Sequence, residues 1–249
     1  MNQFTAKKTS ASACITIGLL LFAITWIGTG TQHIMYHDFV VTLVPKFMPV
    51  KIFWVWLTGL GMLLAGLSFL IRYQISMAAL MLSIMLTFFI VLIHFVRLSS
   101  TTANWMYWFR FIQDTAITGA CLLLTNNTAL IKGGRCIYAG ALLALGVAHF
   151  YHPALITAKV PVYFPAIAVF DYIIGALLIL LTIPILFKFY ADRAALALAV
   201  LLLIFALLYS LPPLIKNIKD AGQWTDFLLD LAVTAGAFFI AGKLKTKPN

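Results

Sequence analysis

The sequence predicts an all-α membrane protein with eight transmembrane helices, arranged as two parallel repeats of four helices. Three observations support this fold class. Hydrophobic residues make up 63% of the 249 residues and charged residues only 10%, whereas a soluble domain is about half apolar and a quarter charged. Apolar segments close to the roughly 20 residues that cross a bilayer recur along the chain. A single fixed offset aligns the two halves of the sequence.

Eight apolar segments are expected to be helices, because backbone groups inside a bilayer must form their hydrogen bonds within their own segment. The strict polar–apolar alternation of barrel strands does not occur in the sequence. Lys7 and Lys8 before the first segment imitate a signal peptide, but no small-x-small cleavage site follows, so we expect an uncleaved first span. The segments cover residues 12–32, 51–71, 75–96, 106–125, 135–151, 166–188, 194–212 and 224–242.

The repeat is visible as an offset of 116 residues, which places Gly30 on Gly146 and His33 on His149. The same offset pairs Pro45 with Pro161, Pro49 with Pro165, Gly59 with Gly175, Trp108 with Trp224, and Asp114 with Asp230. These matches predict an internal duplication, with four-helix repeats at 1–126 and 127–249. Because each repeat has an even number of spans, the two should be parallel and related by a pseudo-twofold axis along the membrane normal.

The net charge of +10 is expected to orient the chain in the membrane, and no nucleic-acid partner is predicted. Lys and Arg are enriched in cytoplasmic loops. With the N-terminus inside, the inner segments carry ten basic residues and one acidic residue, Asp192. The ten are Lys7, Lys8, Arg72, Lys132, Arg135, Lys188, Arg193, Lys243, Lys245 and Lys247. Both termini are therefore expected in the cytoplasm.

Histidines gather in, and directly before, the two connectors that follow the first span of each repeat, residues 34–50 and 150–165. His33 and His37 are four residues apart, with Asp38 beside them, and His149 and His152 are three apart. One hypothesis is an amphipathic connector at the membrane interface; the other is a metal site of His and Asp ligands. Only His33 and His149 recur at the offset of 116, so no metal site is predicted.

Two aspartates inside predicted spans are stronger evidence for a functional site. Asp114 and Asp230 occupy equivalent places in the fourth and eighth segments, and an ionisable group in a span faces the bundle interior with a partner. Arg110 precedes Asp114 by four residues, which allows a pair within one helix. Either a structural ion pair or a ligand-facing carboxylate explains these residues.

The remaining ionisable groups fall in the same half of the membrane. His94 and Arg97 end the third span, and Asp171 begins the sixth. The sequence therefore predicts an outer polar layer above apolar helix packing, which could cap a pocket open to the bilayer or to the outside. The candidate ligand-binding residues are His33, His37, Asp38, His94, Arg97, Arg110, Asp114, His149, His152, Asp171 and Asp230.

No catalytic motif is recognisable. The sequence contains no Ser-His-Asp arrangement, no phosphate-binding glycine loop, no CxxC and no pair of histidines placed to hold haem. The three cysteines are dispersed, which argues against a disulfide framework. Whether the chain is an enzyme is left open by the sequence.

The segment GTGTQHIMYHDFVVTLVPKFMPVKIFWVWLTGLGMLLAGLSFLI resembles the DoxX-like family of bacterial membrane proteins, whose unit has four spans and a V-P-x-x-x-P turn. HFYHPALITAKVPVYFP in the second half resembles the same unit, and AALMLSIMLTFFIVLIHFVRL resembles its third span, with His94 and Arg97. The chain departs from the pattern at Phe95, where a proline often stands, and at Ser210, which takes the place of His94. The resemblance implies a bacterial inner-membrane protein.

Some members of that family resemble subunits of thiosulfate:quinone oxidoreductases, and the unit is also similar to sterol-binding EXPERA proteins. Our preferred hypothesis is a non-catalytic protein that binds a small apolar ligand, a quinone or a lipid, or that supports a complex with a membrane or periplasmic protein. The alternatives are a membrane subunit of a quinone-linked oxidoreductase and a small-molecule transporter built from parallel repeats. The sequence does not identify a cofactor, although the resemblance allows a quinone, and the lipid bilayer is the expected surrounding.

Overall fold

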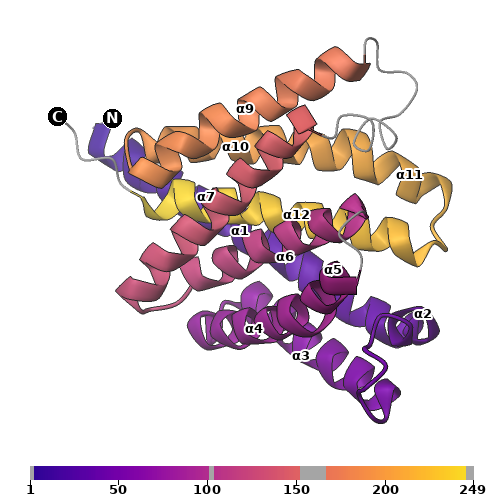
Figure 1. Ribbon diagram of the computed structural model, residues 1–249. Helices are drawn as coiled ribbons and strands as arrows, with labels where there is room; N and C mark the ends of the chain where they lie inside the picture. The colour runs from indigo at the N-terminus through magenta and orange to yellow at the C-terminus, as the bar shows by residue number, and fades with distance from the viewer. Residues whose placement is uncertain (1–2, 101–103, 152–166, 245–249) are drawn as a thin grey trace.

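The computed structural model describes residues 3–100, 104–151 and 167–244, and within them every regular element is a helix (Figure 1). The elements are α1 (Gln3–Met35), α2 (His37–Val41), α3 (Lys51–Ile71), α4 (Ile75–Phe89), η1 (Ile90–Phe95), α5 (Val96–Ser100), α6 (Trp105–Leu123), α7 (Thr128–Tyr151), α9 (Ile167–Phe187), α10 (Ala191–Phe205), η2 (Ala206–Ser210), α11 (Leu211–Lys216) and α12 (Ala221–Lys243).

Seven stretches of the described chain are long and apolar enough to cross a membrane, so the protein is a multi-pass membrane protein. They are Ser12–Met35, Lys51–Ile71, Ile75–Ser99, Thr128–Tyr151, Val169–Phe187, Ala191–Lys216 and Ala221–Lys243. The eighth expected span corresponds to α6, which is not among them. Its first half carries Arg110, Gln113 and Asp114, and these polar residues lower the hydropathy of a helix that is otherwise well buried.

The helices form one bundle in which the start of α1 and the end of α12 lie at the same end. Figure 1 shows that α1 begins and α12 ends at the left end, whereas α2 and α11 lie at the right end, which we call the α2/α11 end. The helix α1 packs mainly on α3 and α12, and α6 packs on α7, α12 and α4. The first and second halves of the chain are therefore interlocked, with α6 against α12 between them.

Close helix contacts depend on glycines. A methyl group on Gly30 would stand 2.7 Å from the carbonyl oxygen of Gly59, and one on Gly146 would stand 3.0 Å from the carbonyl oxygen of Gly175. The glycines thus let α1 approach α3, and α7 approach α9, at backbone distance. Small residues serve this purpose in membrane bundles, where dispersion contacts replace the hydrophobic effect between helices.

Irregular backbone occurs at matching points of the two halves. The α4 helix continues into the π-helical η1, and α10 continues into the π-helical η2. Left-handed residues end or begin helices at the turns between spans. They are Val50, Arg72, Gln74, Lys188 and Tyr190. A π-helical turn widens the helix locally and is often found near a functional site.

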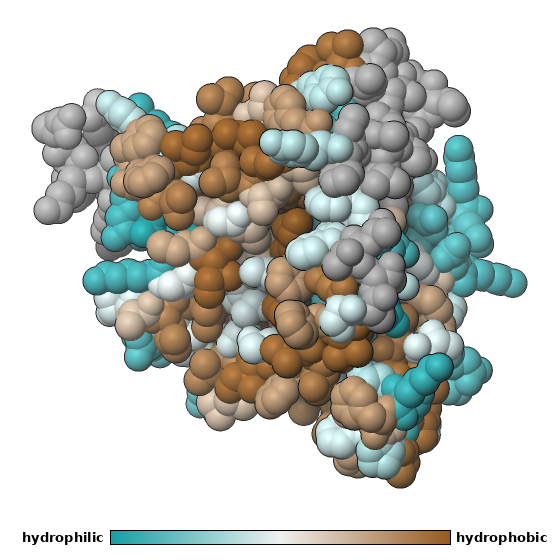
Figure 2. Space-filling view, viewed as in Figure 1, coloured by the Kyte–Doolittle hydropathy of each residue, from teal (hydrophilic) through white to brown (hydrophobic). Residues whose placement is uncertain are grey.

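Large apolar side chains cover the outside of the bundle, as expected for a surface in contact with lipid. Leu64 is 59% exposed, Phe88 58% and Leu180 63%. Figure 2 shows apolar residues over much of the visible face, with hydrophilic residues toward its left and right ends. The interior holds aromatic groups such as Phe22, Trp26 and Phe69, each at most 1% exposed.

Candidate functional site

A cavity of about 990 Å³ lies between α6 and four helices of the second half of the chain, α7, α9, α10 and α12. Its lining is apolar toward the middle of the spans, with Leu142, Leu178 and Val233. It reaches Gln223 near the start of α12, and between Gln223 and Val233 that helix rises about 15 Å. This depth is about half of the ~30 Å hydrocarbon core of a bilayer.

The first polar feature of the cavity is a pair formed by His149 and Asp171. The Nδ1 atom of His149, near the end of α7, lies 2.7 Å from the Oδ1 atom of Asp171, near the start of α9. Their side chains are only 8% and 2% exposed. Gly175, one turn after Asp171, allows this approach, because a methyl group there would stand 2.7 Å from the Cβ of His149.

The Asp171 carboxylate is only partly satisfied. Its Oδ2 atom is buried and has no hydrogen-bond partner within the described residues. Most buried polar atoms have at least one partner, so each exception needs a cause. Because Asp171 lines the cavity, a bound molecule could supply the missing donor.

The second polar feature joins α12 to α6 and η2. The side-chain amide of Gln113 donates a 3.0 Å hydrogen bond to Oδ1 of Asp230, and the hydroxyl of Ser210 donates to Oδ2. Arg110 forms an ion pair with Asp226 and also donates to the Gln113 oxygen at 2.9 Å. These groups form one network at the cavity wall toward the α2/α11 end.

The pair of Arg110 with Asp114, which the spacing allows, is therefore not the one that forms. Both residues lie on α6, but the arginine turns toward Asp226 of α12. The carboxylate of Asp114 instead lies 2.8 Å from Nε2 of His94 on η1, with side-chain exposures of 10% and 12%. The two aspartates that the repeat equates, Asp114 and Asp230, thus have different partners.

The other candidate residues of the first half do not reach the cavity. His33 lies with its Nδ1 2.8 Å from the carbonyl oxygen of Thr29 on its own helix. The side chain of His37 is 43% exposed and that of its neighbour Asp38 is 96% exposed. The guanidinium of Arg97 stands 5.6 Å from the centre of a tyrosine ring on α6.

One further candidate, His152, lies outside the described residues. Within the described ranges, no three His, Cys, Asp or Glu side chains gather closely enough to hold a metal ion. The expected single polar layer is therefore divided. His149, Asp171 and Asp230 line the cavity, whereas His94 and Asp114 form a separate buried pair.

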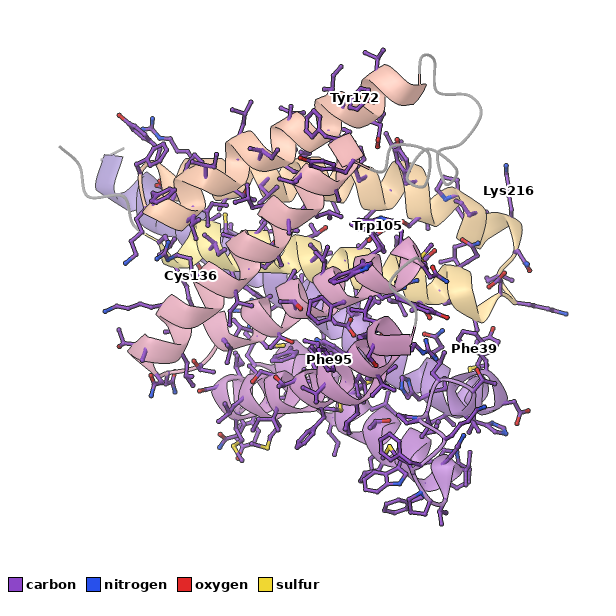
Figure 3. The ribbon with its side chains drawn as sticks, viewed as in Figure 1. Phe39, Phe95, Trp105, Cys136, Tyr172 and Lys216 are labelled. Carbon is purple, nitrogen blue, oxygen red and sulfur yellow. The ribbon has the colours of Figure 1, made fainter. Side chains whose placement is uncertain are left out.

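Sequence reasoning missed several residues that line the cavity. Asp226 carried a usable signal, since it falls opposite Arg110 at the offset of 116 and has the opposite charge. Gln113 is uncharged and gave no signal, and Ser210 was noted only as the residue in the place of His94. Trp105 and Tyr209, two of the aromatic residues in the lining, gave no signal either. Figure 3 shows Trp105 among the helices, and Lys216 projecting from the end opposite Cys136.

No protein-family model, curated protein or solved structure matches the chain. The function is therefore inferred from the cavity and from the polar groups that line it. That lining joins an apolar interior to three carboxylates and an imidazole, an arrangement that can hold the apolar body of a molecule and its polar head.

Proposed function

We propose that this membrane protein binds one small, mainly apolar molecule with a polar head, of the size of a quinone or a single lipid chain. The observation that carries the proposal is the cavity of about 990 Å³, which joins apolar side chains near mid-span to carboxylates near the α2/α11 end. Ligand sites in proteins have this form: concave, mostly apolar, with a few polar groups that fix the orientation.

Packing alone does not account for this space. The cavity is partly open, and its volume lies within the range of about 300–1,000 Å³ that is typical of ligand pockets. A void beside the buried Asp171 would also leave its Oδ2 atom without a donor, at a cost of about 1–3 kcal/mol. A bound molecule fills the volume and meets the carboxylate.

We also propose that the chain consists of two parallel four-helix repeats, at 1–126 and 127–249, with α6 as the eighth span. The π-helical segments support this architecture, because η1 begins at Ile90 and η2 at Ala206, an offset of 116. The ion pair between Arg110 and Asp226 has the same separation. The left-handed residues also match at that offset, Arg72 with Lys188 and Gln74 with Tyr190.

Membership of the DoxX-like family, with both termini in the cytoplasm of a bacterial cell, is part of the same proposal. It rests on the V-P-x-x-x-P connector, on the third-span sequence and on the excess of Lys and Arg in the predicted inner loops. The common location of the start of α1 and the end of α12 is consistent with an even number of spans.

Mass spectrometry of the protein purified in a mild detergent tests the binding function. We expect one small apolar compound to be retained by the wild type and to be lost from Leu178→Trp, which adds bulk to the cavity wall. Leu180→Trp is the matched control, since Leu180 is on the same helix but 63% exposed, whereas Leu178 is 2% exposed. Equal retention by both variants would rule out the cavity as the binding site.

A further inference from the structure

The partly satisfied carboxylate of Asp171 limits which polar head the cavity can accept. Asp171 is 3% exposed, lines the cavity and binds His149 through Oδ1 alone. Its other oxygen, Oδ2, is buried without a partner in the described part of the chain. A carboxylate oxygen only accepts hydrogen bonds. A ligand head that donates a hydrogen bond would satisfy this oxygen, which a quinone or an ester head cannot do.

The charges around the cavity favour a cationic donor. Three carboxylates line it, those of Asp171, Asp226 and Asp230, and its described lining contains no Lys or Arg. Arg110 forms an ion pair with Asp226. His149 balances the charge of Asp171 only when both of its ring nitrogens carry protons. In a low-dielectric interior an uncompensated carboxylate is costly, so a cation near Asp171 is favoured over a neutral head.

Aromatic rings in the same lining suit a cation as well. Trp105 and Phe109 come from α6, and Phe205 and Tyr209 come from α10 and η2. A ring face attracts an ammonium group, most strongly in tryptophan, and the attraction grows where water is excluded. An apolar cavity that combines carboxylates with four aromatic side chains therefore has both groups that commonly recognise amines.

We propose that the cavity binds a lipophilic amine in its ammonium form. The ammonium group donates a hydrogen bond to Oδ2 of Asp171, and the apolar body extends along Leu178 and Val233. This inference rests on the proposed function and narrows it, because it selects an amine among the small apolar molecules that the cavity could hold.

Two rigid probes of nearly identical shape test the inference on the full chain in nanodiscs: 1-adamantylammonium and 1-adamantanol. Binding is followed by titration calorimetry and by tryptophan fluorescence. We expect the amine to bind at least about tenfold more tightly than the alcohol, because the ammonium carries a charge opposite to that of the carboxylate, whereas the alcohol donates a hydrogen bond without a charge. Asp171→Asn should remove this preference, since asparagine can still accept from His149 but has no charge.

Asp38→Asn is the matched control, because the Asp38 side chain is 96% exposed, and it should bind both probes as the wild type does. Equal affinities of the wild type for the amine and the alcohol would overturn the inference, and so would an unchanged preference for the amine in Asp171→Asn. If Asp171→Asn does not fold, the selectivity of the wild type alone decides.

A third probe, menadione, separates failure of this inference from failure of the proposed function. Menadione is apolar and only accepts hydrogen bonds. If menadione binds and Leu178→Trp excludes it, while the amine has no advantage over the alcohol, the cavity is a ligand site but does not select amines. If Leu178→Trp weakens none of the three probes, the cavity is not a ligand site and both proposals are wrong.

Discussion

The ion pair between Arg110 and Asp226 joins the two halves of the bundle, and removing one partner should destabilise the protein measurably. The side chains are 20% and 23% exposed, so neither charge is fully hydrated. Asp226→Asn keeps the shape of the side chain and removes only its charge. Arg110→Met removes the cation together with its 2.9 Å hydrogen bond to Gln113.

The expected magnitude lies between two limits. An exposed ion pair contributes about 0.2–1 kcal/mol, and breaking a buried pair by removing one partner costs about 3–5 kcal/mol. With about one fifth of each side chain exposed, we expect Asp226→Asn to cost about 2 kcal/mol. Arg110→Met should cost about 3 kcal/mol, because the Gln113 bond is lost as well.

Unfolding by SDS in mixed micelles, followed by tryptophan fluorescence, gives the free energies for a double-mutant cycle. We expect a coupling energy of about 1–3 kcal/mol between the two sites. Asp38→Asn should leave the unfolding free energy unchanged, since its side chain is 96% exposed. The charge-swapped double variant, Arg110→Asp with Asp226→Arg, should regain part of the loss if the two positions are related by the proposed pseudo-twofold axis. Additive single effects with no coupling would refute this reasoning.

Three further predictions use other parts of the chain. Gly59→Ala should lower the unfolding free energy by about 1–3 kcal/mol, because the added methyl would stand 2.7 Å from the Cβ of a histidine on α1. Gly61→Ala is the control and should be neutral in the same SDS titration, because Gly61 has open space around it. A cysteine replacing Lys46 should react with an impermeant maleimide in intact cells and one replacing Lys188 only after lysis, and the opposite pattern would reverse the proposed topology. Asp114→Asn should cost about 1–3 kcal/mol, because it weakens the 2.8 Å contact with the histidine of η1; an unchanged melting temperature would contradict this.

The helices were predictable from the sequence because the information is local. A span is set by its own run of apolar residues, and seven of the expected segments overlap stretches that are long and apolar enough to cross a membrane. The eighth expected span, α6, is an exception to this rule. Its interior position depends on contacts with α7 and α12. Residues of α12 and η1 are the partners of the polar side chains that lower the hydropathy of α6.

The pairing of side chains was less predictable, because it depends on how each helix is rotated toward its neighbours. Arg110 and Asp114 have the spacing of an intrahelical pair, yet each side chain turns to a different helix. The partner of Arg110 is 116 positions away. The pairing of residues 110 and 226 could have been predicted from the sequence only by assuming that a twofold axis passes close to both of them.

His149 and Asp171 were both candidate residues, but their sequence separation of 22 gave no indication of contact. The approach of α7 to α9 is set by Gly146 and Gly175, which meet at backbone distance. The sequence alone could identify these glycines as small residues suited to packing. The side chains that face each other are determined by the point along each helix at which the two helices cross and by the rotation of each helix about its axis. Both depend on the packing of the whole bundle.

Under the proposed duplication, a comparison of equivalent positions in the two halves distinguishes residues needed for helix packing from residues that are not. Gly59 and Gly175 both make room for a histidine of the neighbouring helix, since a methyl group on either would stand 2.7 Å from that histidine's Cβ. The histidines then differ. His33 contacts a carbonyl of its own helix, and the position equivalent to Asp171 in its half is Val55, 1% exposed. A carboxylate that only one half possesses is not needed for the helix packing that both halves share, which agrees with the proposed role of Asp171 in ligand binding.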